Sequence, residues 1–262
     1  TPITDAFIGV ARSHGEFLVD QEGFPQSKVH VIPNGIDCSR FVPDETERAD
    51  VRRELGIPED ALLVGIVAAL RSEKNHQLLL RAASRLRDRY PNLHWMIVGD
   101  GPERGAIETS ATELSIADRV HLLGTRHDTP RLVAALDVFT LCSLNEAAPV
   151  SILEALSCEV PTVASDVGSV SEMVNDGETG HLFPAGDLDS MVSALGRLLD
   201  DAEARRRLGR AGRRFVQRNG SLESMVDGYQ ELLTSLYRGA DDRSGEQNAE
   251  KLTPHRLNLD RP

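Results

Sequence analysis

Two glutamates flanking an expected helix start are the residues best suited to chemistry. Glu146 lies in an expected loop, and Glu154 lies one turn into a helix that should begin near Pro149, since proline suits a first helical turn. The unpaired amides of Val150 and Ser151 would then form a partly positive helix end that suits a phosphate. A carboxylate on either side of that phosphate can accept hydrogen bonds from sugar hydroxyls. The pattern predicts a nucleotide-sugar site, although acids also occur at helix starts for the dipole alone.

Composition limits the classes of protein and of partner. The 262 residues carry a net charge of −12, and 40% of them are hydrophobic but only 4% aromatic. These values are typical of a soluble globular protein with one large or two small domains, and they argue against a nucleic-acid partner. Three cysteines without a CxxC pair predict neither a disulfide framework nor a metal site, and they fit a cytoplasmic location. No apolar run is long enough to span a bilayer.

Strands and helices alternate through the centre of the chain. The expected strands are the apolar runs Leu62–Ala68, His94–Val98, Val120–Leu123, Val138–Cys142, Thr162–Ala164 and Gly180–Phe183. Helical periodicity fills the intervals, and three helices follow the last strand. The fold class predicted is therefore α/β, with a doubly wound, mostly parallel, Rossmann-like sheet and C-terminal helices. Loops after such strands gather at one edge of the sheet, where ligands bind.

Two further cations are expected at this edge. Lys74 follows the first of these strands, and a lysine in the first turn of a helix opposes the helix dipole, which favours a role as a phosphate ligand over a solvated lysine. Arg126 follows the third strand, and we expect the nucleotide base to be selected near Gly124–Arg126.

Five short motifs occur in an order that resembles the C-terminal, donor-binding half of a retaining glycosyltransferase of the family 4 type. The motifs are Val31–Asp37, Glu73–His76, Val98–Pro102, Glu146–Glu154 and Asp176–Gly180. Each motif alone is weak, whereas the ordered set is strong and the paired glutamates are its most specific part. The resemblance implies a GT-B fold, in which two Rossmann-like domains hold the donor in the cleft between them.

The resemblance also assigns roles by position. It implies that Lys74 contacts the donor diphosphate, that Glu146 holds the donor hexose, and that these two residues take part in catalysis. It places Glu154 on the ribose hydroxyls, with the backbone of Val150 and Ser151 on the phosphates. No metal or other cofactor is implied. The implied partners are a UDP- or GDP-sugar donor and a sugar, lipid or small-molecule acceptor, including an acceptor at a membrane surface, to which the full-length protein would be peripheral.

The same resemblance divides the chain into four segments. Residues 1–42 are expected to be the edge or remnant of an N-terminal acceptor domain, and residues 43–60 a linker and helix, with the linker at Pro43–Asp50. Residues 61–238 form the nucleotide-sugar-binding domain. Residues 239–262 are polar and charged, so we expect a disordered tail. The chain begins in the middle of a pattern, which suggests a fragment of a longer protein.

One departure from the family pattern leaves alternatives open. The family has an arginine where this chain has Ala69, and Arg71 is the nearest candidate to replace it. The family histidine near the sugar has no counterpart before Leu62, since His14 and His30 are expected at the surface or on a strand. The alternatives are a non-catalytic nucleotide-sugar-binding module or inactive fragment, and an epimerase that shares the GT-B fold. A nicotinamide-dependent oxidoreductase would need a GxGxxG after the first strand, which is absent.

Overall fold

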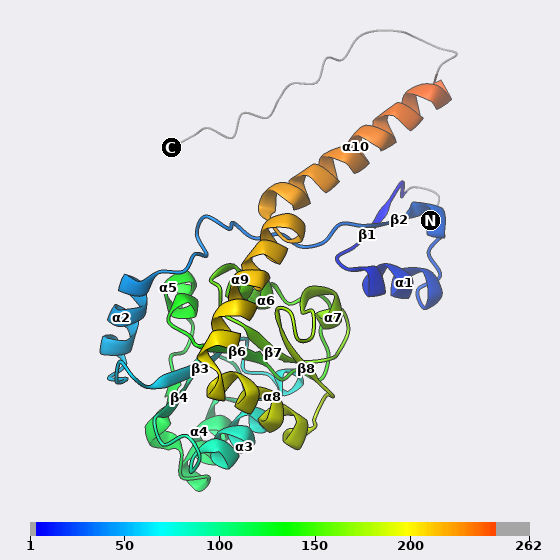
Figure 1. Cartoon of the computed structure of the whole chain (residues 1–262). Helices are drawn as coiled ribbons and strands as arrows, with labels where there is room; N and C mark the ends of the chain where they lie inside the picture. The colour runs from blue at the N-terminus through cyan, green and yellow to red at the C-terminus, as the bar shows by residue number, and fades with distance from the viewer. Residues whose placement is uncertain (1–3, 245–262) are drawn as a thin grey trace. The chain divides into compact units, whose positions relative to one another are not determined.

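The central sheet of the protein is parallel and doubly wound. The computed structural model describes residues 4–244, with side chains to residue 238 (Figure 1). Within this range six strands pair in parallel, in the order β5 (Val120–Leu122), β4 (Leu93–Val98), β3 (Leu62–Val67), β6 (Val138–Leu141), β7 (Thr162–Ser165) and β8 (Gly180–Phe183). The predicted fold class is confirmed.

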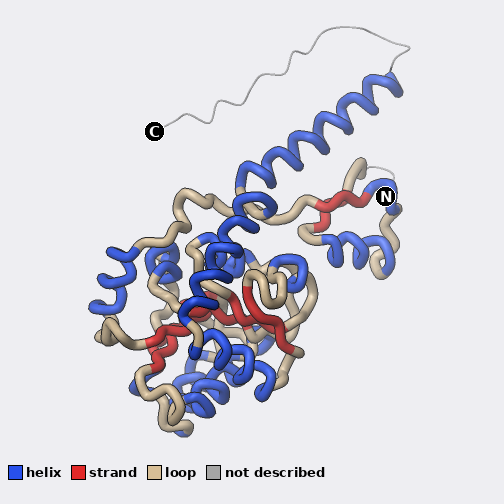
Figure 2. Tube along the Cα trace, in the orientation of Figure 1, coloured by secondary structure: helices blue, strands red, loops and turns tan. Residues whose placement is uncertain are grey.

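Helices cover both faces of this sheet. On one side α3 (His76–Leu86) packs against α4 (Arg104–Glu113) and α8 (Leu188–Asp200). On the other side α6 (Val150–Ser157) packs against α5 (Thr129–Ala134) and α9 (Ala202–Asn219). Figure 2 shows the strands running between these helices. Because both faces are covered, central strands read as continuous apolar runs, and Leu63, Ile66 and Phe139 are fully buried.

The order of the strands creates a switch point between β3 and β6. The chain leaves β3 through α3 towards β4, whereas it leaves β6 through α6 towards β7 on the opposite side. The loops that follow β3 and β6 therefore separate at the carboxyl edge of the sheet. Ligands of doubly wound proteins bind in the crevice at such a switch point.

The segment that the sequence predicted as a linker at Pro43–Asp50 is mostly helical, so that prediction was wrong. Helix α2 (Glu45–Glu54) begins there, capped by the Asp44 carboxylate, which accepts two amides of the first turn. Val51 is fully buried, and the buried guanidinium of Arg52 donates to Asp137 Oδ2 at 2.8 Å. Tertiary contacts thus stabilise a helix whose first turns consist mostly of polar residues and carry no apolar periodicity.

The described residues before residue 32 form a small strand–helix–strand element. Strands β1 (Phe7–Gly9) and β2 (Val29–Val31) pair in parallel, with α1 (Arg12–Asp20) and the short helix η1 (Gln26–Lys28) between them. Gly15 of α1 lies so close to Val31 that an added Cβ would come within 2.8 Å of its side chain. The assignment of residues 1–42 to an acceptor domain stays a prediction.

The chain divides into two compact units, residues 1–225 and 226–262. Helix α10 (Leu222–Ser244) begins in the first unit and forms the described part of the second. It continues past residue 238, where the tail was expected to begin, so residues 239–244 of the expected tail are helical. The remainder of that tail, residues 245–262, lies outside the described residues. In the part of the chain that the structure describes, no helix combines the length and the apolar character needed to cross a membrane.

Candidate functional site

Backbone contacts at the switch point tie the loop after β3 to the loop after β6. The Leu144 amide donates to the Glu73 carbonyl at 2.7 Å, and the buried Cys142 thiol donates to the Lys74 carbonyl at 3.4 Å. The short helix η2 (Ser72–Lys74) ends at Asn75, whose φ of 50° turns the chain into α3. Asparagine adopts this left-handed conformation more readily than most residues. These contacts hold the backbone of Lys74 beside the loop that carries Glu146.

Lys74 and Glu146 meet directly. Lys74 Nζ lies 2.6 Å from Glu146 Oε1, and the Ser143 hydroxyl donates to the same oxygen at 2.6 Å. The Ser165 hydroxyl in turn donates to the Ser143 carbonyl, also at 2.6 Å. Glu146 is only 9% exposed, and its Oε2 accepts no hydrogen bond from the described residues. The carboxylate is therefore fixed through one oxygen and keeps the other available.

A glycine in the next loop allows the chain to close over Glu146. Gly168 has a φ of +53°, and a Cβ added to it would lie 1.7 Å from the Glu146 carbonyl oxygen. Only glycine fits this conformation and this contact without strain. The neighbouring Ser169 hydroxyl donates to the Ala147 carbonyl. The loop before α7 (Val170–Met173) thus fixes the backbone on both sides of the Glu146 peptide.

The start of α6 offers two unused amides. Pro149 stands at its N-cap and supplies no side-chain cap. Val150 and Ser151 donate no backbone hydrogen bond to any described residue, and Val150 is 37% exposed. Together with the helix dipole, two such amides make an anion site. Glu154 follows in the next turn and is half-buried, and burial raises its pKa against the opposing positive charge of Arg40.

The position of the missing family arginine is open to solvent. Ala69 is exposed, and the side chain of Arg71 is exposed and makes no hydrogen bond or ion pair with the described residues. The Leu70 amide donates to the Asp100 carbonyl at 3.0 Å, so the Gly99–Gly101 loop packs against the segment that contains Ala69 and Arg71. Arg71 therefore has an uncommitted guanidinium in the same loop as Lys74.

Arg126 has other partners than a nucleotide base. Its guanidinium donates to Glu54 Oε1 at 3.2 Å and to Asp128 Oδ2 at 2.6 Å. These bonds hold the pKa of Asp128 well below its usual range, chiefly through Arg126 and further through Arg131. None of these partners belongs to the Lys74–Glu146 cluster. The predicted role of Arg126 in donor binding stays a prediction, and it would require these ion pairs to rearrange.

Sequence reasoning missed several residues of the cluster. Ser143 stands three residues before Glu146 and directly after the buried strand, so its place at the carboxyl edge could have been read from the strand alone. The contacts of Ser165 and Gly168 join neighbouring loops and carry no local signal. Among residues 4–238, no group of three or more His, Cys, Asp or Glu side chains is arranged to hold a metal. The prediction of a metal-independent site stays untested.

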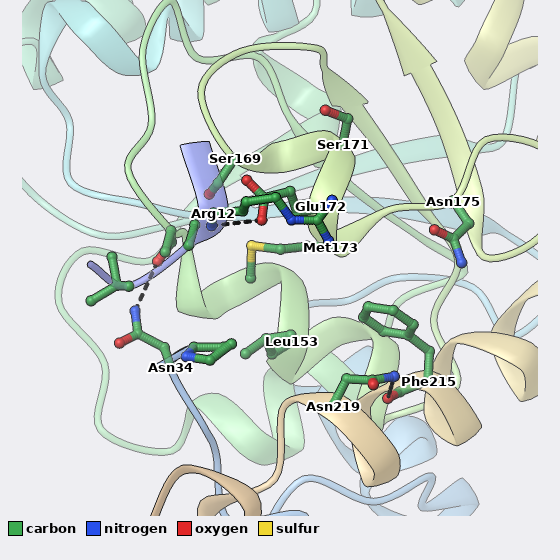
Figure 3. A pocket seen from close by; sticks show the side chains of 14 residues that line it. Arg12, Asn34, Leu153, Ser169, Ser171, Glu172, Met173, Asn175, Phe215 and Asn219 are labelled. Atoms are coloured by element: carbon green, nitrogen blue, oxygen red, sulfur yellow. Dashed lines mark hydrogen bonds between the residues drawn. The ribbon is translucent and has the colours of Figure 1, made fainter. Parts of the chain in front are cut away.

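Two cavities adjoin the loop before α6. One, of about 360 Å³, is lined by Glu146 and Gly168 together with residues of α1. The other, of about 420 Å³, lies on the side of Leu153 and is shown in Figure 3. Asn34 borders this second cavity and donates to the Ala148 carbonyl at 3.2 Å. Of the sequence-predicted donor-binding residues, only Glu146 lines the first of these cavities and none lines the second. The predicted site therefore stays a prediction.

Sequence comparison gives this geometry a context. A sequence profile described as "Glycosyl transferases group 1" matches residues 47–215. The chain is 36% identical over 216 residues to a D-inositol 3-phosphate glycosyltransferase of Stackebrandtia nassauensis, covering 78% of this chain and 48% of that protein. It is 32% identical over 206 residues to a GDP-mannose-dependent alpha-(1-6)-phosphatidylinositol monomannoside mannosyltransferase of Mycolicibacterium smegmatis, covering 74% of this chain and 53% of that protein.

Solved structures agree with the fold. The Anabaena protein HepE, crystallised with UDP and glucose, superimposes with a TM-score of 0.82 at 23% identity, covering 88% of this chain and 63% of HepE. At that identity the likeness concerns the fold alone. The chain spans about half the length of the curated relatives described above.

Proposed function

The chain belongs to the family of group 1 glycosyl transferases, and on this premise we propose that its switch-point edge binds a nucleotide-sugar donor. The proposed reaction, in the full-length protein, is the transfer of a hexose from a UDP- or GDP-sugar to an acceptor with retention. The 2.6 Å contact between Lys74 and Glu146, beside the unused amides of α6, carries this proposal. UDP in HepE and the GDP-mannose of the mycolicibacterial relative's name support both nucleotides as candidates.

Each group in the cluster has a proposed task. Lys74 and the amides of Val150 and Ser151 bind the diphosphate, and they stabilise the negative charge that develops on it as it leaves. The unpaired oxygen of Glu146 accepts a hydrogen bond from a hexose hydroxyl, and Glu154 accepts from the ribose. Lys74 exchanges its contact with Glu146 for one with phosphate. We propose that these groups act without a metal ion or cofactor. The acceptor is a sugar, a lipid or another small molecule.

Calorimetric titration with UDP and with GDP tests the proposal. Lys74→Met should weaken the affinity for the preferred nucleotide roughly 10–100-fold, because a hydrogen bond to a charged group is lost. Lys28→Met is the matched control, since Lys28 Nζ donates to the Thr4 carbonyl and takes no part in the cluster. No binding of either nucleotide at millimolar concentration would count against the proposed function.

A non-catalytic nucleotide-sugar-binding module is the second candidate, and Ala69 favours it. Without an arginine at that position, one donor that would stabilise the leaving diphosphate is missing. Loss of one such donor costs on the order of 10²–10³ in rate. A coupled assay for released UDP or GDP separates the candidates: binding without turnover in the full-length protein supports the module, whereas turnover supports the transferase.

A further inference from the structure

The cavity beside Glu146 has a second wall that the proposed function does not use. Three of its lining residues, Ser13, His14 and Phe17, come from α1. The opposite wall carries Glu146, whose Oε2 accepts no hydrogen bond from the described residues. At about 360 Å³ the cavity falls in the range of small-molecule sites. A ligand group held by Glu146 would therefore also meet α1.

A carboxylate from another element holds α1 in this place. The helix has no capping side chain of its own, because Ala11 stands at its N-cap. Instead the Glu172 carboxylate accepts the Arg12 amide (Figure 3) and the Ser13 amide, both at 2.8 Å. Burial opposes the ionisation of Glu172, but the hydrogen bonds from Ser13 and Arg12, together with the charge of Arg12, outweigh it and lower the pKa of the carboxyl. An ionised acid at a helix N-terminus is favourable. Glu172 thus anchors the turn that carries His14.

One ring nitrogen of His14 has a hydrogen-bond partner and the other has none among the described residues. Its Nδ1 accepts the Val10 amide at 3.3 Å, so the proton of the neutral ring lies on Nε2. That nitrogen has no hydrogen-bond partner among residues 4–238. Both residues line the cavity, His14 with a free donor on Nε2 and Glu146 with a free acceptor, Oε2, among the described residues. A sugar hydroxyl can serve both groups, since it donates and accepts.

We propose that α1 is the second wall of the donor-sugar subsite, with His14 as a sugar-contacting residue and Glu172 as the residue that positions it. This inference rests on the proposed function, because it takes the sugar at Glu146 to be the hexose of the nucleotide-sugar. It assigns a task to His14 that the sequence did not indicate. The sugar contributes to affinity through both walls, whereas the nucleotide makes no contact with α1.

The test compares nucleotides with and without their sugar on the chain as it exists. UDP, UDP-glucose, UDP-N-acetylglucosamine, GDP and GDP-mannose are titrated by calorimetry, and the tightest sugar nucleotide is used for the variants. His14→Ala should weaken that nucleotide-sugar roughly 3–10-fold and leave the free nucleotide unchanged, because one hydrogen bond to the sugar is lost. Glu172→Ala should weaken it similarly, and Glu172→Asp should restore part of the loss. His30→Ala, which changes a histidine on β2, is the matched control.

Nuclear magnetic resonance of the His14 ring distinguishes contact with the sugar from a purely structural role of His14. The chain has eight histidines, and His14→Ala assigns the ring resonance of His14. The sugar nucleotide should shift that resonance clearly more than the free nucleotide does, and Glu172→Ala should abolish the difference. If nucleotides bind but His14 responds equally to both ligands, the inference is wrong and the proposed function stands. If neither UDP nor GDP binds, the proposed function is wrong, and this inference fails with it.

Discussion

Strand β6 has an acidic side chain at each end, and the molecule uses the two carboxylates differently. Asp137, just before the strand, pairs with Arg48 at 2.7 Å and with Arg52 at 2.8 Å, and it also accepts the Leu63 amide at 2.7 Å. Both of its oxygens have partners. Glu146, after the strand, uses only Oε1.

The difference separates a structural ion pair from the proposed binding site. A buried carboxylate with every partner in place locks elements together, and breaking such a pair is strongly destabilising. A carboxylate with an unused oxygen beside a cavity retains binding capacity, and groups of this kind often contribute little to stability. In this chain the Asp137 ion pairs lie at the amino end of β6. Glu146, with its unused oxygen, lies beyond the carboxyl end, the edge at which ligands of doubly wound sheets bind.

Matched substitutions at the two pairs should give the largest contrast. Arg52→Met leaves the half-buried Asp137 without its buried partner, so we expect a loss of about 3 kcal/mol in the free energy of unfolding. Lys74→Met should cost at most about 1 kcal/mol, because Lys74 is partly exposed and Glu146 borders a cavity that can hold water. Urea unfolding of both variants measures this. Equal losses would remove the distinction between the pairs.

A second contrast involves the pH dependence of stability beside Lys74. His76 is 2% exposed, neither ring nitrogen has a hydrogen-bond partner among the described residues, and burial, aided by Lys74, lowers its pKa from 6.5 to about 4. Protons then bind the unfolded chain preferentially, so stability is lost as pH falls from about 6.5 towards 4, by about 3 kcal/mol in full. His76→Leu should remove this part of the acid sensitivity.

The control for that variant is the exposed His127. Denaturant unfolding at a series of pH values should show His127→Leu following the parent protein, while His76→Leu loses less stability on acidification. An unchanged acid sensitivity in His76→Leu would mean that the buried ring is not the group responsible.

The smallest effect is expected from adding a positive charge near Lys74, which should change nucleotide affinity. Ala69→Arg adds a guanidinium at an exposed position next to the Lys74 loop, where the family pattern has an arginine. We expect UDP or GDP to bind roughly tenfold more tightly, since a charge-assisted hydrogen bond is gained. Calorimetry measures it, with Ala69→Gln as the uncharged control. No gain over that control would indicate that Arg71 already supplies the charge.

The sequence predicts those parts of the molecule that local pattern determines. The strand at Leu62–Val67 was visible because burial on both faces requires a continuous apolar run. The start of α2 was missed, because its polar first turns are held by Asp137 from a distant segment. The contact of Glu172 with Ser13 joins residues 159 positions apart, and no local signal marks it. The meeting of Lys74 with Glu146 followed from the rule on strand ends, together with the resemblance to a known family.

A map of backbone amide shifts on adding UDP or GDP tests most directly whether the nucleotide binds at the start of α6. We expect the largest saturable shifts at Val150 and Ser151, with smaller ones in the loop around Lys74 and on Glu154. Lys74→Met should require correspondingly more ligand to reach the same shifts. Shifts concentrated instead around the cavity that Asn175 and Asn219 line, with the start of α6 unaffected, would contradict binding at that helix start.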